Sequence, residues 1–224
     1  MLPNPYTPGE LPRVLAGRQP QQSTIRDRIS RVAQFGEYAG PLLVFHGPRG
    51  VGKTSLLRDG QHQAEVQGFL TAWVSCTRRK PFLPDIASRV TRALTSSDAF
   101  AGKKGAQVGL RLERITAQMG PSVARLSASF AAATPAHSQP EQATMSAVED
   151  LLHEASRAVR SVGGAGLVLF VDELHAAHQS DLAVLLNALQ NLEGRRSENP
   201  LTVMTAGLPS TPGWITKAAT FGER

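Results

Sequence analysis

Residues 45–55 read Phe45-His46-Gly47-Pro48-Arg49-Gly50-Val51-Gly52-Lys53-Thr54-Ser55. The residues before this stretch, 41–45, are apolar and lie between two glycines, which is typical of a buried parallel strand. The residues after it, 53–67, are helix formers and place Leu56 and Leu57 on one face. The sequence therefore predicts a strand, a glycine-rich loop and a helix in direct succession.

The loop has the pattern G-x-x-x-x-G-K-T of a phosphate-binding loop, and the predicted strand and helix supply the context that this pattern requires. Glycines let consecutive backbone N–H groups turn toward phosphate oxygens, and a helix N-terminus adds positive charge. Lys53 is expected to reach the β- and γ-phosphates of a nucleotide, and the Thr54 hydroxyl to bind Mg²⁺. The residues expected to hold the nucleotide are Gly47, Pro48, Arg49, Gly50, Val51, Gly52, Lys53, Thr54 and Ser55.

Two positions in this loop differ from the rest in what they can offer. Pro48 has no N–H group, so the donors are expected to come from Arg49 onward. The Arg49 side chain either touches phosphate or is solvated, and the sequence leaves both readings open.

A second apolar run, residues 166–171, ends in two adjacent acids, Asp172 and Glu173. An open parallel sheet binds its ligand at the carboxyl ends of its strands. Together with the phosphate-binding loop, this run predicts that Asp172 holds Mg²⁺, directly or through water. Glu173 would orient and deprotonate the attacking water. His175 and His178 follow and could suggest a metal site with Asp172, but the lack of a nearby cysteine or further spaced histidine favours a solvated or helix-start role.

The rest of the chain alternates between further helical and strand patterns. Helices are expected at 21–35, 84–94, 143–162 and 181–192, and strands at 69–75 and 201–206. Residues 97–142 are the least regular: Val108, Leu110 and Leu112 alternate with other residues and hint at a short strand. The small residues at 127–140 predict a mobile insertion that is partly disordered.

Composition narrows the class of protein. A chain of 224 residues suits one α/β domain, and a single cysteine, Cys76, excludes a disulfide framework within the chain. We interpret Cys76 as a buried small residue rather than a redox site. The sequence shows neither a signal-peptide pattern nor an apolar run of membrane-spanning length, so we expect a cytoplasmic protein with no membrane contact.

The net charge of +6 favours contact with anions, including nucleic acid. Residues 101–140 carry five basic residues and one acidic residue, either as a nucleic-acid footprint or, more commonly, as a solvated surface. No helix-turn-helix or other DNA-reading motif is apparent. Contact with DNA is therefore a hypothesis that rests on charge alone.

With these motifs and residues 204–209, the chain resembles the AAA+ ATPases, and most of all bacterial ATP-binding proteins with an origin-recognition-complex-like ATPase domain. Residues 3–9 and 14–18 are similar to the N-terminal segment of that group. The resemblance implies a three-layer α/β/α fold of the P-loop NTPase type, with a mostly parallel sheet in the order 5-1-4-3-2. Gly17 and Arg18 would then lie near the adenine, and Thr205 would match the polar sensor of the γ-phosphate, with Thr202 as a competitor.

The sequence also departs from the family pattern. AAA+ modules continue into a fifth strand and a helical lid, whereas this sequence stops at Arg224, so we expect both to be missing. The expected organisation is an extended arm at 1–20, an ATPase core at 21–210 with an irregular insertion at about 97–142, and a tail at 211–224 that begins the missing lid. Arg195 and Arg196 are the nearest candidates for an arginine finger.

The sequence thus predicts an enzyme that binds Mg²⁺ and ATP and hydrolyses the nucleotide with Lys53, Glu173 and Thr205 at the reaction. The absence of an N-K-x-D guanine-reading sequence favours ATP over GTP. Two alternatives stay open: a nucleotide-dependent signalling switch with little turnover, and a DNA-associated ATPase whose DNA-reading part lies elsewhere. Self-assembly into an oligomer is expected from the family resemblance.

Overall fold

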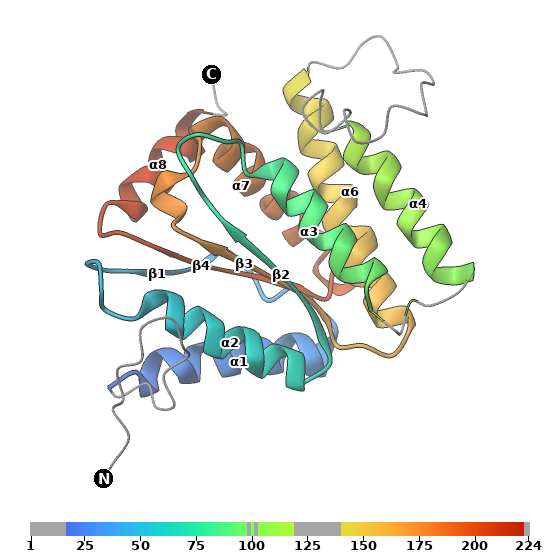
Figure 1. Ribbon diagram of the computed structural model, residues 1–224, viewed down its shortest axis with the longest axis horizontal. Helices are drawn as coiled ribbons and strands as arrows, with labels where there is room; N and C mark the ends of the chain where they lie inside the picture. Colours follow the sequence, from blue (N-terminus) through green and yellow to red (C-terminus); the bar gives the residue numbers. More distant parts are fainter. Residues whose placement is uncertain (1–16, 98–99, 101–102, 119–139, 222–224) are drawn as a thin grey trace.

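The computed structural model describes residues 17–97, 100, 103–118 and 140–221, and its centre is a four-stranded parallel sheet (Figure 1). The strands, in the spatial order β1-β4-β3-β2, are β1 Leu43–His46, β4 Leu201–Gly207, β3 Gly166–Asp172 and β2 Phe69–Ser75. This is the order expected from the family resemblance without its fifth strand, which the described residues do not contain. The predicted α/β fold class is confirmed.

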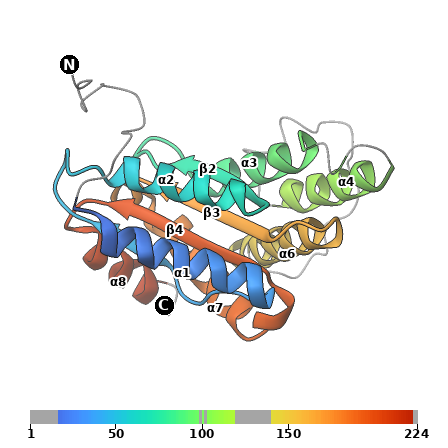
Figure 2. The ribbon, with the colours of Figure 1, turned by 90° about the horizontal axis from the view of Figure 1, so that it is seen from below.

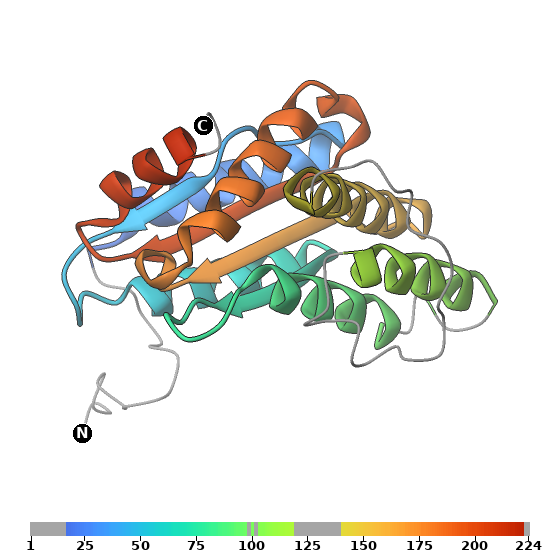
Figure 3. The same ribbon diagram turned by 90° about the horizontal axis from the view of Figure 1, so that it is seen from above.

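Helices cover both faces of the sheet and make the predicted three layers. One face is covered by α1 Gln19–Phe35 and α2 Lys53–Val66, which lie together in front of the sheet in Figure 2. The opposite layer, seen from above in Figure 3, contains α3 Leu83–Thr95, α4 Lys103–Gln118, α6 Pro140–Ser161, α7 Gln179–Glu193 and α8 Thr211–Phe221. Two short 3₁₀ turns, η2 Leu174–Ala176 and η3 Arg196–Glu198, flank α7.

Side-chain alternation along the two central strands explains the two cores. Every residue of β3 and β4 is buried, as expected of parallel strands covered on both faces. In β3, Leu167, Leu169 and Val171 pack with the layer that holds α3, α6 and α7, whereas Val168 and Phe170 pack toward α1 and α2. The next residue in this alternation is Asp172, whose side chain therefore faces α2.

The prediction of a short strand near residues 108–112 is wrong. These residues belong to α4, where Leu112 and Ile115 are buried and Val108 is half-buried, a spacing that one helix face produces. A Cβ on Gly109 would lie 3.5 Å from Thr95, an ordinary van der Waals distance, so α4 packs against the end of α3 at this position. The apparent alternation arose because Gly109 and Arg111 separate the apolar residues.

Two further parts of the predicted organisation need comment. The predicted arm lies mostly in residues 1–16, and most of the predicted insertion lies in 119–139; both ranges fall outside the described residues. Residues 211–221, treated above as the beginning of a tail, form α8, which packs against α7. The Trp214 indole N–H donates to the Ala177 carbonyl at 3.0 Å and fixes α8 beside the end of η2.

Within the described residues, no helix combines the length and the apolar character needed to span a membrane.

Candidate functional site

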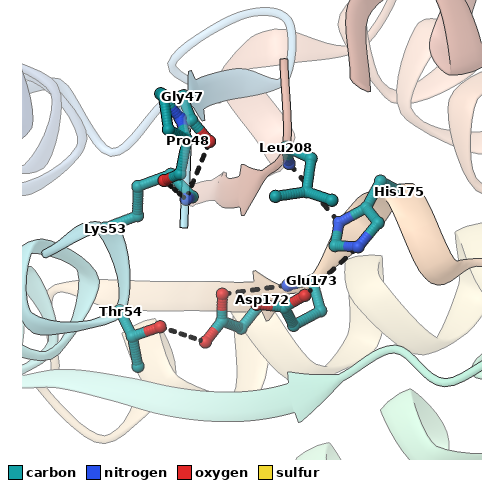
Figure 4. A network of polar contacts seen from close by, with 8 residues as sticks. All are labelled: Gly47, Pro48, Lys53, Thr54, Asp172, Glu173, His175 and Leu208. Carbon is teal, nitrogen blue, oxygen red and sulfur yellow. Dashed lines mark hydrogen bonds and ion pairs between the residues drawn. The ribbon is translucent and has the colours of Figure 1, made fainter. Parts of the chain in front are cut away.

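A cavity of about 550 Å³ opens at the carboxyl end of the sheet, where the two predicted motifs meet. Its lining residues are Arg49, Gly50, Gly52, Lys53, Thr54, Ser55 and Glu173. The loop after β1 and the end of β3 are far apart in sequence, and the parallel sheet brings them together because both follow a strand at the same edge. Figure 4 shows the polar contacts between the two segments.

The backbone of the glycine-rich loop is shaped for a ligand with many oxygens. Gly50 and Gly52 have φ angles of 78° and 80°, in the left-handed region that other residues rarely adopt. Gly52 precedes α2 and offers no side-chain cap, so the first N–H groups of α2 are left for an anion. A Cβ built on either glycine would meet nothing within 4 Å, which leaves space beside the backbone for phosphate groups.

The Lys53 ammonium lies against this loop. Its Nζ atom donates to the carbonyl oxygens of Gly47 at 2.9 Å and Pro48 at 2.7 Å (Figure 4). An ammonium group has three donors, so one remains for a ligand without disturbing these contacts. The structure thus brings Lys53 to the cavity, as predicted.

Thr54 and Asp172 form a pair of oxygens beside the cavity. The Thr54 hydroxyl donates to Asp172 Oδ2 at 2.8 Å, and Asp172 Oδ1 accepts the N–H of Glu173 at 2.9 Å. Asp172 is only 5% exposed, because its side chain lies between β3 and α2. Hard oxygen ligands on one or two protein groups, completed by phosphate and water, suit Mg²⁺. The side chains present therefore fit a magnesium ion bound together with phosphate.

Glu173 follows the end of β3 in a left-handed conformation, with φ 55° and ψ 37°. It is the one residue other than glycine with a positive φ in the described part of the chain. This turn sends its side chain away from Asp172 and toward the cavity, where 42% of the side chain is exposed. Its Oε2 atom lies 3.3 Å from Nε2 of His175 (Figure 4).

His175 contacts Glu173, a residue of the cavity lining, and the sequence analysis did not predict this contact. Its side chain is 9% exposed and lies between Glu173 and the main-chain N–H of Leu208, which donates to Nδ1 at 3.4 Å. His178 lies elsewhere, just before α7, with Nε2 at 3.0 Å from the Arg78 carbonyl. The described residues contain no group of three metal-binding side chains. The signal in the sequence was the spacing Asp-Glu-x-His, which places a histidine two residues after the predicted base.

The residues expected near the adenine lie beside the loop. Arg18 precedes α1, and its guanidinium donates to the Val51 carbonyl. Gly17, with φ 71°, turns the chain into α1. The structure therefore brings Arg18 to the glycine-rich loop, and the role of Gly17 and Arg18 toward the base of a nucleotide stays a prediction.

The structure does not bring Thr205 to the cavity. Thr205 is buried, lies in register with Val44 of β1, and donates its hydroxyl to the Leu43 carbonyl at 3.2 Å. Its expected place at the tip of the strand is wrong, because β4 continues to Gly207. Thr202 pairs with Val168, still farther from the carboxyl end.

The arginine-finger candidates lie at the opposite edge of the sheet. Arg195 and Arg196 precede β4, so they lie at its amino end, and Arg196 Nε donates to the Tyr38 carbonyl at 3.3 Å. They cannot reach the cavity of their own chain, and a role at a neighbouring copy stays a prediction. Cys76 is buried as predicted, and this burial, together with the nearby carboxylates of Asp181 and Asp172, raises the pKa of its thiol to about 12.

Comparisons with known proteins agree with this geometry. A family model described as an AAA ATPase domain matches residues 14–204. Among solved structures, that of Cdc6p from Pyrobaculum aerophilum matches with a TM-score of 0.51 and 14% sequence identity. The match covers 95% of this chain and 46% of that chain, and at this identity the likeness shows the fold alone. A search of curated protein sequences found no match.

Proposed function

The chain belongs to the AAA ATPase domain family, and from this membership and the cavity at the sheet edge we propose that it binds Mg²⁺-ATP and hydrolyses it to ADP and phosphate. The family membership bears out the resemblance seen in the sequence and makes the chain a member of a nucleotide-binding family. The identity of the nucleotide, the metal and the roles of single residues belong to the proposal.

The observation that carries the proposal is that both motifs face one cavity. Lys53 and the uncapped N-terminus of α2 supply positive charge and donors for phosphate oxygens. Thr54 and Asp172, already 2.8 Å apart, supply oxygen ligands for Mg²⁺. Glu173 faces the same cavity from the other side, where it can accept a proton.

Each of these groups has a separate role in the proposed reaction. Bound Mg²⁺ would neutralise charge that develops on the β- and γ-phosphate oxygens. Lys53 binds the same oxygens from the loop. Glu173 accepts a proton from a water molecule while the water oxygen forms a bond to the γ-phosphorus. The bond from that phosphorus to the β–γ bridging oxygen breaks, and ADP leaves with the bonding electron pair.

A second candidate is a nucleotide-dependent switch with little turnover. The position of Thr205 favours it, because this expected sensor of the γ-phosphate is buried and does not line the cavity. The two functions differ in a measurable way: an enzyme releases phosphate with repeated turnover, whereas a switch retains the nucleotide that it binds.

The first test is binding of a fluorescent ATP analogue in the presence of Mg²⁺, with unlabelled ATP, ADP and GTP as competitors. Lys53→Ala should weaken binding by at least about tenfold, because the charge next to the phosphates is lost. Lys80→Ala is the matched control, since Lys80 is exposed and lies outside the cavity. Equal binding by the parent and Lys53→Ala would overturn the proposed site.

Phosphate release is measured next. Glu173→Gln should bind the analogue like the parent and release no phosphate, because the amide cannot take a proton from water. Release at the parent rate would refute the assignment of Glu173 as the base. Tight binding without release by the parent would favour the switch.

We also propose self-assembly and a cytoplasmic location, as expected from the family resemblance and the composition. Sedimentation with and without ATP tests assembly. We also propose contact with DNA, on the basis of the family resemblance and the net charge of +6. A flat binding response to duplex DNA at low salt would remove it, because basic proteins bind DNA most tightly there.

A further inference from the structure

One peptide unit, between Gly207 and Leu208, contacts both halves of the cavity. Its carbonyl oxygen, on Gly207, accepts the N–H of Gly47 at 3.2 Å, at the start of the glycine-rich loop. Its N–H group, on Leu208, donates to His175 Nδ1 at 3.4 Å. A peptide unit is planar and rigid, so these two hydrogen bonds move together. A displacement of the loop is therefore expected to move His175 as well, because both are hydrogen-bonded to this peptide at the end of β4.

The hydrogen bond from Leu208 also decides where the His175 ring carries its proton. A main-chain N–H can only donate, so Nδ1 must be the accepting nitrogen. In neutral imidazole the proton is then on Nε2, which lies 3.3 Å from Glu173 Oε2. The ring thus receives a hydrogen bond on one side and donates one to the carboxylate on the other.

Glu173 depends on this donor for its orientation. Within the described part of the chain, the His175 ring is the partner that contacts its carboxylate. The ring is nearly closed to solvent, at 9% exposure, whereas the carboxylate faces the cavity with 42% of the side chain exposed. His175 therefore holds the carboxylate from the protein side and leaves the other side open to a ligand.

The end of β4 packs closely against the start of α8. Close packing would let a displacement of the glycine-rich loop reach His175. A Cβ on Gly207 would lie 2.1 Å from Thr211 Oγ1 and 3.1 Å from Thr211 Cβ. Thr211 itself is fully buried at the start of α8, and its N–H donates to the Leu208 carbonyl at 2.9 Å. Contacts with Thr211 thus restrict the chain on both sides of this peptide unit, at the Gly207 Cα and at the Leu208 carbonyl.

We propose that His175 is a positioning residue that orients Glu173 and, through the Gly207–Leu208 peptide, ties the orientation of Glu173 to the position of the glycine-rich loop. The inference rests on the proposed role of Glu173 as the base. Phosphate groups that draw the loop toward them would pull on the same peptide, and the carboxylate would follow. Binding of phosphate to the glycine-rich loop and orientation of the Glu173 carboxylate would then occur together.

Two substitutions separate the two contacts of the ring. The side-chain nitrogen of His175→Gln can occupy the place of Nε2 and donate to Glu173. The side-chain oxygen of His175→Asn can occupy the place of Nδ1 and accept from Leu208, but the side chain is too short to reach Glu173. We expect His175→Gln, which keeps the donor to Glu173 but loses the contact with Leu208, to lower phosphate release about threefold, and His175→Asn to lower it by at least about tenfold. Binding of the ATP analogue should stay within about twofold in both.

NMR spectroscopy of the chain without nucleotide tests the proposal independently of ATP hydrolysis. In the nucleotide-free chain, the ¹⁵N shifts of the His175 ring, identified by the signal missing in His175→Gln, should show a protonated Nε2 and an unprotonated Nδ1. Glu173→Gln should change the shift of Nε2. A proton on Nδ1, or no response to Glu173→Gln, would overturn the proposal even if the chain has no measurable ATPase activity. Phosphate release by Glu173→Gln at the parent rate would instead refute the proposed role of Glu173 as the base.

The peptide link has its own test. Gly207→Ala should displace the peptide by its clash with Thr211 and lower phosphate release, while Gly207→Ala combined with Thr211→Ala should recover part of it, because the 2.1 Å contact with Oγ1 is removed and a 3.1 Å contact with the Cβ at position 211 stays. Equal phosphate release from the parent and Gly207→Ala would refute the link. Equal losses in binding, folding and turnover for His175→Asn and His175→Gln would show a structural role only and refute the positioning role.

Discussion

The left-handed backbone at Glu173 predicts that this position stores strain for the sake of function. Its φ of 55° and ψ of 37° are costly for a residue with a Cβ. Replacing Glu173 with glycine should relieve that cost, whereas replacing it with alanine should not. We therefore expect Glu173→Gly to be more stable than Glu173→Ala, although neither has a carboxylate to act as a base.

The magnitude follows from three contributions. The left-handed conformation costs about 1–2 kcal/mol for an L-residue relative to glycine. The greater freedom of glycine in the unfolded chain offsets about 0.5–1 kcal/mol of that gain. Both variants lose the contact with His175 equally, so it cancels in the comparison. The free energy of unfolding of Glu173→Gly should exceed that of Glu173→Ala by roughly 0.5–1 kcal/mol.

Urea unfolding followed by tryptophan fluorescence measures this difference. Glu113 is the matched control, because it is an exposed glutamate inside α4 with right-handed helical backbone. There the order should reverse, with glycine less stable than alanine by about 1 kcal/mol. If glycine is also the less stable substitution at position 173, the backbone there is not strained and the reasoning fails.

Three further predictions concern stability. Gly166→Ala should prevent folding or cost more than about 3 kcal/mol, because its Cβ would lie 2.2 Å from the Pro200 carbonyl oxygen, whereas Gly163→Ala, with nothing within 4 Å, should cost about 1 kcal/mol; circular dichroism and urea unfolding distinguish them. Burial raises the pKa of the Cys76 thiol from 9.0 to about 12. The unfolded chain therefore loses this proton first, and stability should fall as the pH rises from 9.0 toward about 12, by roughly 2 kcal/mol near pH 10.5; Cys76→Ala should remove this part of the pH dependence. Asp181→Ala should cost about 1–2 kcal/mol in urea unfolding, since its carboxylate accepts two main-chain N–H groups at the start of α3, at 2.7 and 3.3 Å, and an unchanged midpoint would show that the cap contributes nothing.

Most of the fold could be predicted because each strand and most helices depend on local patterns. The apolar runs at 69–75, 166–171 and 201–206 all became strands of the central sheet. The prediction of a short strand near residues 108–112 was wrong for a physical reason: these residues belong to α4, which packs against α3 and α6, and the short alternation within it resembled a strand. A helix face on which Val108 is half-buried and Leu112 and Ile115 are buried becomes visible only over a window longer than the alternation.

The candidate site also contains residues whose positions local patterns could predict and residues whose positions they could not. Lys53, Thr54, Asp172 and Glu173 are tied to strand ends by their motifs, and the structure places all four at or beside one cavity. The place of Thr205 depended on where β4 ends, and strand ends are set by pairing with β1 rather than by the residues themselves. The contacts of His175 were missed because its two partners, Glu173 and Leu208, follow the ends of different strands. No local sequence pattern indicates such a contact.

Asp172 and Glu173 are adjacent in sequence, yet they depend on different parts of the molecule. The strand alternation turns Asp172 toward Thr54 and α2, so the geometry of the proposed cation ligands depends on the helix that begins at Lys53. The left-handed residue that follows turns Glu173 toward His175, and through the Gly207–Leu208 peptide toward the first glycine of the loop. The loop and α2 are continuous, so a ligand that displaces residues 47–54 acts on both carboxylates at once, although by two separate routes. A substitution on one route should therefore alter the base without altering the cation ligands, which is the separation that the His175 and Gly207 variants measure.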